Sequence, residues 1–246
     1  VLAVNESAAE RALNDRFGTG QSALDGILRA TRILLAGQTV VVLGYGWTGR
    51  GVALRARGAG ASVVVCEVDA LRALEARMEG FEVLTASDAA ERGDVFITVT
   101  GSRDVLRGEH FLRMRDGAIL ANAGHFDVEI AIADLKALAG ENVVQALPLV
   151  EQYEVEPCRR LNLLARGQVI NLAAAQGHPA AVMDVSFAIQ ALSAEHLART
   201  EVEPGVRQVP EAIDAEVARL KLESLGVAID AETPEQQTYR GRWRTS

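Results

Sequence analysis

The sequence predicts an α/β protein with a doubly wound, parallel sheet of the Rossmann type and a carboxy-terminal helical extension. Three observations predict this fold. Short apolar runs alternate with segments of helical periodicity, the run at 39–43 leads into the glycine motif G-Y-G-W-T-G, and a second run at 62–66 ends beside Glu67. A strand, a glycine turn, a helix, a second strand and an acid form the pattern of a dinucleotide-binding βαβ unit.

The spacing of apolar residues predicts the order of the elements. Residues 1–4 are expected to form a strand, residues 5–13 a short helix, and the polar stretch 14–21 a loop. The sheet is expected to take strands at 39–43, 62–66, 82–84, 95–98 and 118–121, with helices at 22–35, 48–57, 70–79, 88–92, 108–114 and 127–139. Further strands are expected at 143–150 and 160–171, with Gly167 as the turn of a hairpin, then helices at 179–199 and 210–225 and a polar tail at 232–246.

The glycine motif suits a dinucleotide because each glycine removes a side chain that would obstruct the turn. Gly44 lets the chain turn tightly, Gly46 lets the backbone approach a pyrophosphate, and Gly49 lets helix and strand pack closely. The helix start at Trp47 and Thr48 presents free N–H groups and a positive dipole end to the phosphates. A tight βα turn without a ligand is the alternative that the glycines alone leave open.

The acid after the second strand indicates which dinucleotide is bound. Glu67 lies eighteen residues beyond Gly49, where its carboxylate is placed to accept hydrogen bonds from the adenosine ribose hydroxyls. A carboxylate at this position repels a 2′-phosphate, so NAD is favoured over NADP as the cofactor. Arg72, five residues further on, is the one residue that weakens this argument.

The composition narrows the class of protein and of partner. Apolar residues make up 49% of the 246 residues and charged residues 24%, as in ordinary globular domains, and the net charge of −8 argues against a nucleic-acid or anionic-membrane partner. No apolar run approaches the roughly 18 residues of a membrane span, and no signal peptide opens the chain. Cys66 and Cys158 lie far apart without the spacing of a zinc site. We therefore expect a cytoplasmic protein with a small-molecule substrate and no metal.

Four blocks of the sequence carry a resemblance to a known family. They are N-D-R-F-G-T-G-Q-S-x-x-D-G-I at 14–27, A-G-x-x-V-V-V-L-G-Y-G at 36–46, N-x-G-H-F-D-V-E-I at 122–130, and V-I-N-L…G-H-P at 169–179. Over residues 5–239 the chain resembles the S-adenosyl-L-homocysteine hydrolase family. The likeness is to the NAD-binding part of that enzyme together with its returning carboxy-terminal segment.

The resemblance implies a domain organisation and an assembly. The family's amino-terminal substrate domain has no counterpart here, and the chain opens on Val1 rather than Met, so we expect the carboxy-terminal part of something longer. Residues 1–21 are then a hinge segment from the missing substrate domain, 22–178 the NAD-binding Rossmann domain, and 179–246 the returning helices and tail. The family is typically a homotetramer, which implies a homo-oligomer, and an apolar surface left exposed on the returning helix would favour one.

The chemistry that the resemblance implies is a redox-assisted elimination. NAD takes a hydride from C3′ of the adenosyl ribose, and the resulting 3′-ketone acidifies the C4′ proton. Homocysteine then leaves from C5′, water adds in its place, and the stored hydride restores the alcohol. NAD is therefore recycled and should be held tightly, while the protein orients it and moves protons.

The family motifs assign candidate site residues by position. NAD would be held by Gly44, Gly46, Trp47, Thr48, Gly49, Glu67, Thr98, Thr100, Gly101, Asn122, Gly124, His125, Asn171 and His178. Thr98 and Thr100 would lie on the nicotinamide side, and Asn171 would reach the carboxamide. The catalytic group would comprise His125, His178, Asn14 and Asp15. A hydrogen-bonded structural histidine is the alternative for each histidine, but both follow strands at the edge where α/β sheets bind ligands.

The chain departs from the family pattern at the substrate ribose. The family carries a Lys and, four residues later, an Asp followed by an Asn, where this chain holds Glu10, Asn14 and Asp15. The change to Glu10 removes a cationic proton-transfer group. Gln176 stands where a methionine is usual beside the adenine. Three interpretations follow: an S-adenosyl-L-homocysteine hydrolase, a catalytically silent NAD-binding paralogue with a regulatory or scaffolding role, and an ordinary dehydrogenase. The G-H-F-D-V-E-I and G-H-P blocks argue against the last.

Overall fold

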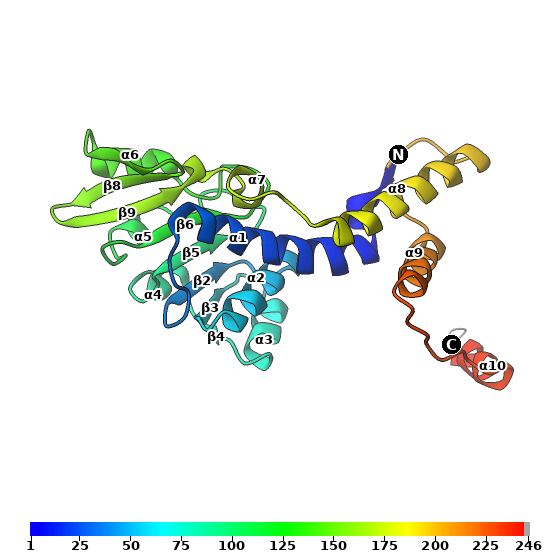
Figure 1. Ribbon diagram of the computed structural model, residues 1–246. Helices are drawn as coiled ribbons and strands as arrows, with labels where there is room; N and C mark the ends of the chain where they lie inside the picture. Colours follow the sequence, from blue (N-terminus) through cyan, green and yellow to red (C-terminus); the bar gives the residue numbers. More distant parts are fainter. Residues whose placement is uncertain (244–246) are drawn as a thin grey trace.

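An eight-stranded, mostly parallel sheet forms the centre of the protein (Figure 1). The computed structural model describes residues 1–243. The strands follow the spatial order β4-β3-β2-β5-β6-β9-β8-β7, in which the two pairs made by β8 are antiparallel and the other pairs are parallel. Their bounds are β2 Thr39–Leu43, β3 Ser62–Cys66, β4 Glu82–Val83, β5 Val95–Thr98, β6 Ile119–Asn122, β7 Val143–Leu147, β8 Val150–Glu156 and β9 Arg159–Leu164. The predicted Rossmann fold is confirmed.

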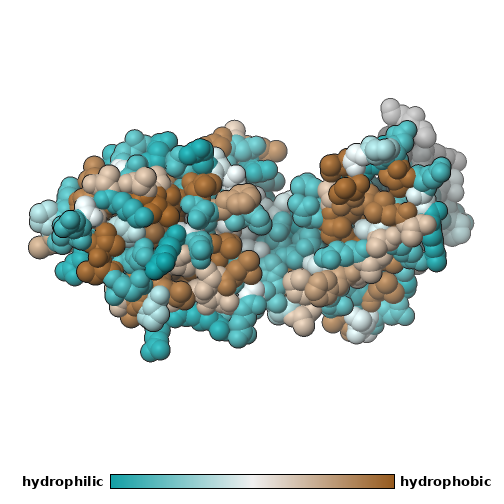
Figure 2. Space-filling model, turned by 90° about the horizontal axis from the view of Figure 1, so that it is seen from above, coloured by the Kyte–Doolittle hydropathy of each residue, from teal (hydrophilic) through white to brown (hydrophobic). Residues whose placement is uncertain are grey.

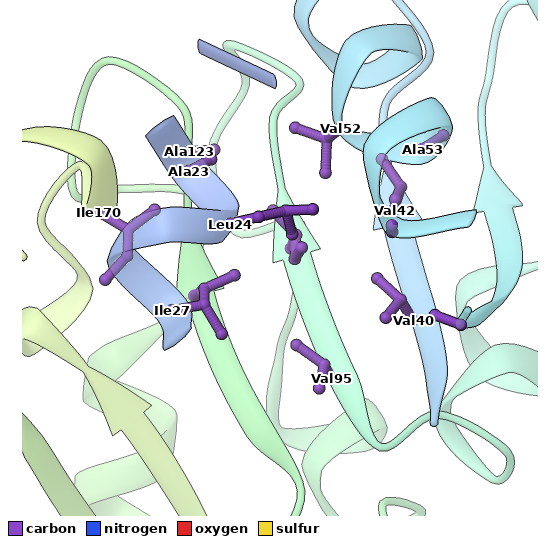
Figure 3. Packing of buried hydrophobic residues seen from close by; sticks show 14 of the residues in the cluster. Ala23, Leu24, Ile27, Val40, Val42, Val52, Ala53, Val95, Ala123 and Ile170 are labelled. Atoms are coloured by element: carbon purple, nitrogen blue, oxygen red, sulfur yellow. The ribbon is translucent and has the colours of Figure 1, made fainter. Parts of the chain in front are cut away.

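Helices cover both faces of the sheet because the central strands are apolar on both sides. In β2, Val40 and Val42 face one hydrophobic cluster, and Val41 and Leu43 face the other. The first face is covered by α1 Gly20–Thr31, α2 Trp47–Gly58, α3 Ala70–Met78 and α7 Ile170–Ala173, and the second by α4 Ala86–Ala90, α5 Gly108–Phe111 and α6 Ile132–Ala139. Figure 3 shows Leu24 and Ile27 of α1 packed over β5 and β6, with Val40 and Val42 of β2 beside α2.

A smaller helical lobe lies beside the sheet (Figure 1). Its helices α8 Ala180–Arg199 and α9 Glu211–Ser224 pack through a separate cluster formed by Val185, Ile189, Val209, Ile213 and Val217. The amino terminus belongs to this lobe, since β1 Leu2–Ala3 pairs with β10 Arg207–Gln208 and is followed by the 3₁₀ turn Val4–Glu6. A last helix, α10 Pro234–Trp243, follows. None of the helices in the described chain is both long and apolar enough to cross a membrane.

The segment that joins the two parts differs from the prediction. Residues 14–21 were expected to form a loop, but Glu10–Thr19 forms a π-helix, η2, that continues directly into α1. Its backbone packs against α2 at very short range, because a Cβ added to Gly51 would lie 1.9 Å from the Arg16 carbonyl oxygen. This tertiary contact explains why a polar, glycine-bearing stretch is helical. π-Helices are rare and are found mostly at functional sites.

The second half of the sheet also corrects a prediction. Gly167 was expected to form a hairpin turn, but it lies in the 3₁₀ turn Ala165–Gly167, and the hairpin between β8 and β9 turns at Cys158 with a φ of 63°. The strand β8 was not predicted. Its buried side chains, Val150, Tyr153 and Val155, are unevenly spaced, so the alternation of buried and exposed residues that identifies a strand in sequence is broken at Glu151 and Gln152. The predicted tail at 232–246 contains α10, and its residues 244–246 lie outside the described residues.

Candidate functional site

The glycine turn between β2 and α2 has the geometry that a pyrophosphate requires. Gly44 has a φ of 106°, and a Cβ added to Gly49 would lie 2.0 Å from the Gly44 carbonyl oxygen. Within the described chain, only the Arg72 guanidinium would come within 4 Å of a Cβ added to Gly46, at 3.8 Å, so this face of the turn is open. No side chain caps α2, which leaves the N–H groups of its first turn, beginning at Trp47, directed at an anion.

Glu67 joins the glycine turn to the next loop. Its Oε2 accepts a hydrogen bond from the Tyr45 N–H at 2.6 Å, and its Oε1 accepts from the N–H groups of Val68 and Asp69 at 2.7 and 3.0 Å. These bonds hold the carboxylate at the carboxyl end of β3, beside the turn. The predicted acid is therefore fixed at the rim of the site rather than free on the surface.

A cavity of about 640 Å³ opens beside the glycine turn. Its lining comes mainly from the segments that follow β2, β3, β4 and β5 and includes Gly44, Gly46, Glu67, Thr100 and Arg103. After β2 the chain crosses to one face of the sheet and after β5 to the other, so the cavity lies at the topological switch point where such sheets bind ligands. An open glycine backbone, an uncapped helix start and an acid at the rim fit a dinucleotide.

Asn122 at the end of β6 holds the following loop in place. Its Oδ1 accepts hydrogen bonds from the Thr98 hydroxyl at 3.1 Å and the Gly124 N–H at 2.8 Å. Its Nδ2 donates to the carbonyl oxygens of Phe126 and Gly167 at 2.8 and 2.9 Å. The side chain, 1% exposed, has its hydrogen-bonding capacity committed to the protein. Asn122 and Thr98 therefore shape the loop rather than offer free groups to a ligand.

Asn171, in contrast to Asn122, has a side-chain oxygen without a hydrogen-bond partner in the described part of the chain. This residue of α7 is 6% exposed, and its Oδ1 is buried without a hydrogen-bond partner among the described residues. Val169, two residues earlier, forms an isolated bridge with Asn122, which places α7 beside the end of β6. A buried acceptor without a partner is costly, so it indicates a missing donor. The carboxamide of a nicotinamide is such a donor, and the orphaned oxygen fits the predicted role.

Glu129 is a site residue that sequence reasoning missed. It is 1% exposed, and its carboxylate accepts hydrogen bonds from the Thr100 N–H, the Thr100 hydroxyl and the Gly101 N–H at 2.9, 2.8 and 2.8 Å. It thereby fixes the loop after β5 that was predicted to lie against the nicotinamide. These partners precede Glu129 by 28 and 29 residues, so no local spacing indicates the contact.

His125 lies in the loop after β6 and is exposed. Its ring meets the Phe126 ring edge-on, with centroids 4.6 Å apart. It lines a second cavity of about 450 Å³ together with Gln168 and Leu172, at the side of the sheet domain where α7 lies. The imidazole is thus accessible to a ligand in this cavity, whose lining includes Leu172 and Ala173 of α7.

The other predicted catalytic residues, Asn14, Asp15 and His178, lie between η2 and α8 beside Glu10, where the smaller lobe meets the π-helix. Glu10 accepts hydrogen bonds from the Asn14 Nδ2 at 2.7 Å and from the Ser186 hydroxyl at 2.8 and 2.6 Å. Asn14 Nδ2 also lies 2.8 Å from the Ser186 Oγ. Ser186 is 1% exposed, so the three side chains form a partly buried network across the junction. The glutamate at position 10, where the family pattern has a lysine, therefore has hydrogen-bond partners for its carboxylate in this fold.

Two titratable groups flank this network. Burial, followed by the negative charge of Glu10, raises the pKa of Asp15 to about 6. Burial lowers the pKa of His178, and the charge of Glu10 opposes that shift. His178 Nε2 lies 3.0 Å from the Thr19 hydroxyl. The Asp15 carboxyl keeps its proton to a higher pH than an ordinary aspartate, and the His178 imidazole loses its proton at a lower pH than an ordinary histidine. The two side chains therefore form a suitable pair for moving protons near neutral pH.

The predicted residues thus form three groups. Gly44, Gly46, Glu67 and Thr100 line the larger cavity, and Trp47, Thr48, Gly49 and Gly101 are their neighbours in the same turn and loop. Thr98, Asn122, Gly124, His125 and Asn171 lie at the ends of β5 and β6 and around α7. Asn14, Asp15 and His178 lie at the junction with the smaller lobe. The open glycine turn and the unpaired Asn171 oxygen suit a dinucleotide, Thr98 and Asn122 hold the loop between them, and the third group suits acid–base chemistry.

Comparison with known proteins agrees with this site. Residues 15–177 match the family model described as the S-adenosyl-L-homocysteine hydrolase NAD binding domain. This match confirms NAD as the cofactor that was predicted from the glycine turn and Glu67.

Several curated relatives match almost the whole chain. A protein of Methanopyrus kandleri named S-inosyl-L-homocysteine hydrolase is 54% identical over 99% of this chain and 58% of its own length. Proteins named adenosylhomocysteinase from Thermosynechococcus vestitus and Archaeoglobus fulgidus are 53% and 54% identical over 98% and 99% of this chain, and 56% and 60% of their own lengths. The chain therefore spans somewhat more than half the length of these relatives.

A solved structure repeats the fold at much lower sequence similarity. The dipicolinate synthase A chain of Bacillus subtilis aligns with a TM-score of 0.54 and 16% identity over 80% of this chain and 58% of that one. This likeness concerns the arrangement of the sheet and helices alone.

Proposed function

Because this chain belongs to the S-adenosyl-L-homocysteine hydrolase family, we propose that it forms the cofactor-binding half of a site that hydrolyses a nucleosidyl-homocysteine thioether. The observation that carries the proposal is that one chain holds both an NAD-type cavity beside the glycine turn and, between η2 and α8, an acid–base cluster of Glu10, Asp15 and His178. The names of the relatives suggest two substrates, S-adenosyl-L-homocysteine and S-inosyl-L-homocysteine. The first remains the primary proposal.

The residues of the chain supply binding and proton transfer. Bound NAD supplies a reversible hydride acceptor for the 3′-carbon of the ribose. The open turn at Gly46 and the start of α2 receive the pyrophosphate, Glu67 receives the adenosine ribose, and Asn171 Oδ1 accepts a hydrogen bond from the carboxamide. His125 in the loop after β6 is then available beside the reacting ribose, which lies between the two lobes.

His178 and Asp15 are proposed to move the protons. Since burial lowers the pKa of His178, its imidazole is neutral at physiological pH and can accept a proton from the substrate. Burial and Glu10 raise the pKa of Asp15 to about 6, so this carboxyl takes up and releases a proton more readily near neutral pH than an ordinary aspartate. Asn14 and Ser186 orient Glu10, and Glu10 sets the charge next to both groups.

A second function is suggested by the same network. The carboxylate of Glu10 is occupied by Ser186 and Asn14 and occupies the position where the family resemblance implies a lysine. If no other group replaces that lysine, the chain is a catalytically silent NAD-binding paralogue with a regulatory or scaffolding role. The two proposals make opposite predictions for hydride transfer and the same prediction for NAD binding.

The decisive experiment separates binding from hydride transfer. The purified protein is loaded with NAD, and the absorbance of NADH at about 340 nm is followed after addition of adenosine, inosine or S-adenosyl-L-homocysteine. A rise with a nucleoside supports the hydrolase proposal, and the preferred base identifies the substrate. A flat trace with NAD shown to be bound would leave the silent paralogue.

The assembly is proposed along with the function. We propose residues 1–21 as the hinge from a substrate domain, 22–178 as the NAD-binding domain and 179–246 as returning helices and tail, in a cytoplasmic homotetramer. Figure 2 shows hydrophobic surface gathered on the smaller lobe, where the exposed large apolar side chains include Phe187, Leu197, Val206 and Leu220. Such a patch favours association with another chain or domain.

A further inference from the structure

The buried carboxylate of Glu129 has hydrogen-bond donors around it but no cation. Thr100 and Gly101 supply its three donors, and Thr100 Oγ1 also accepts a hydrogen bond from the Ser102 N–H at 3.0 Å. The hydroxyl proton of Thr100 is therefore free to point at Glu129. Among the side chains of residues 1–241, no lysine, arginine or histidine nitrogen forms an ion pair with this carboxylate.

This pattern of partners identifies Glu129 as a negative charge. An ionised carboxylate only accepts hydrogen bonds, whereas a protonated one needs an acceptor for its own proton. The three groups of Thr100 and Gly101 that are hydrogen-bonded to the Glu129 carboxylate all donate, which matches the ionised form. A buried charge without a counter-charge is expensive, so a positive group near it would be stabilised.

Glu129 lies between the loops that follow β5 and β6. On one side it holds Thr100 and Gly101, and on the other a Cβ added to Gly124 would lie 1.8 Å from Glu129 Oε1. Its own backbone carbonyl accepts the N–H of Val105 at 2.7 Å, which fixes its position independently of the side chain. The two loops are those that we assign to the nicotinamide end of NAD.

We propose that Glu129 stabilises the oxidised form of the bound cofactor and so lowers the reduction potential of the bound NAD⁺/NADH couple. The nicotinamide ring of NAD⁺ carries a positive charge, and a hydride, which brings two electrons and one proton, neutralises it. A fixed negative charge beside the ring therefore favours NAD⁺. The inference rests on the placement of the nicotinamide given under the proposed function, and it deepens that function because it keeps the resting cofactor ready to accept a hydride.

The test compares two dissociation constants in the absence of substrate. NAD⁺ and NADH are titrated separately into the wild-type protein, into Glu129→Gln and into Asp94→Asn. Two unit charges about 10 Å apart at an effective dielectric of about 20 change an equilibrium on the order of tenfold. We expect Glu129→Gln to weaken NAD⁺ binding roughly tenfold more than NADH binding, which corresponds to a potential about 30 mV higher for a two-electron couple.

Asp94→Asn is the matched control. Asp94 also accepts a backbone hydrogen bond, from Thr39 N–H at 2.7 Å. It precedes β5, however, and so lies at the opposite end of that strand from Thr100. Its variant should leave the ratio of the two constants unchanged. Glu129→Asp keeps the charge in a shorter side chain, so it should weaken both forms of the cofactor while the ratio stays near the wild-type value.

The outcomes separate an electrostatic role from a structural one. If Glu129→Gln weakens NAD⁺ and NADH equally, or leaves both unchanged, the proposal is wrong. If that variant does not fold, the wild-type protein still tests the proposal, because tighter binding of NADH than of NAD⁺ would overturn it. The ratio is measured without a nucleoside, so a shifted ratio together with a flat hydride-transfer trace would support this inference while refuting the proposed hydrolase.

Discussion

Asp15→Asn should stabilise the protein at alkaline pH and have little effect in acid. Burial and the charge of Glu10 raise the pKa of Asp15 from 3.8 to about 6, so ionisation of this carboxyl is less favourable in the folded chain than in the unfolded chain. The penalty is absent below the unfolded pKa, grows as the pH rises between about 4 and 6, and is complete above that range. Asparagine never ionises, so the variant escapes the penalty.

The size of the effect follows from the shift. About two pKa units correspond to roughly 3 kcal/mol, and the half-buried position of Asp15 reduces this to about 1–2 kcal/mol because water screens part of the interaction. We expect Asp15→Asn to raise the free energy of unfolding by that amount at pH 8 and by less than about 0.5 kcal/mol at pH 4. Urea unfolding of both proteins across this range measures the difference directly.

A matched variant separates this effect from the general loss of a carboxylate. Asp25 lies on the exposed side of α1 and pairs with Arg29 at 2.9 Å, so Asp25→Asn should lower stability slightly, by about 0.3–0.5 kcal/mol, without the alkaline gain. Equal values for Asp15→Asn at pH 4 and pH 8 would refute the reasoning. If Asp15 also moves protons, the stabilised variant should lose hydride-transfer activity, as expected of a residue that lowers stability for function.

Three further variants test other parts of the site. Gly49→Ala places a Cβ 2.0 Å from the Gly44 carbonyl oxygen, so we expect NAD binding by calorimetry to fall at least about tenfold while far-UV circular dichroism stays native. Ser186→Ala removes a buried partner of Glu10 and Asn14 and should lower the free energy of unfolding in urea by about 2 kcal/mol. If adding Glu10→Gln to this variant lowers the free energy no further, the two substitutions remove the same interaction. Asn171→Leu should weaken NAD several-fold but leave ADP-ribose, which lacks the nicotinamide, unchanged; equal losses for both ligands would contradict the role given to its unpaired oxygen.

The strands of the first half could be predicted because their signals are local. β2 at Thr39–Leu43, β3 at Ser62–Cys66 and β5 at Val95–Thr98 have the predicted bounds, since each is a continuous apolar run that is buried on both faces and bounded by polar or glycine residues. The π-helix η2 was missed because its helical form depends on packing against α2, and periodicity within the segment carries no record of that contact.

The same distinction between local and long-range signals applies to the site. The glycine turn and Glu67 are found by spacing, since one βα turn and the next strand create them. Glu129 was read as part of a family block, but its function depends on the neighbouring positions of β5 and β6, which bring Thr100 to it. The contact between Glu10 and Ser186 joins residues 176 positions apart and was equally invisible in the sequence.

The paired nature of the changes around Glu10 favours a working site over a decayed one. The resemblance implies a lysine and an aspartate four residues apart, a cation beside an anion, where this chain has Glu10 and Asn14. A loss of function that removed only the lysine would leave a carboxylate without its partner. Here the acceptor stands at position 10 and the donor at position 14, the reverse of the family order. Glu10 accepts a hydrogen bond from the Asn14 amide at 2.7 Å, and both side chains contact Ser186. The network is complete as an acceptor–donor pair, and it places its negative charge beside Asp15 and His178. Hydride transfer that persists in wild type but is lost in Glu10→Gln, with NAD affinity unchanged, would establish that this charge is used.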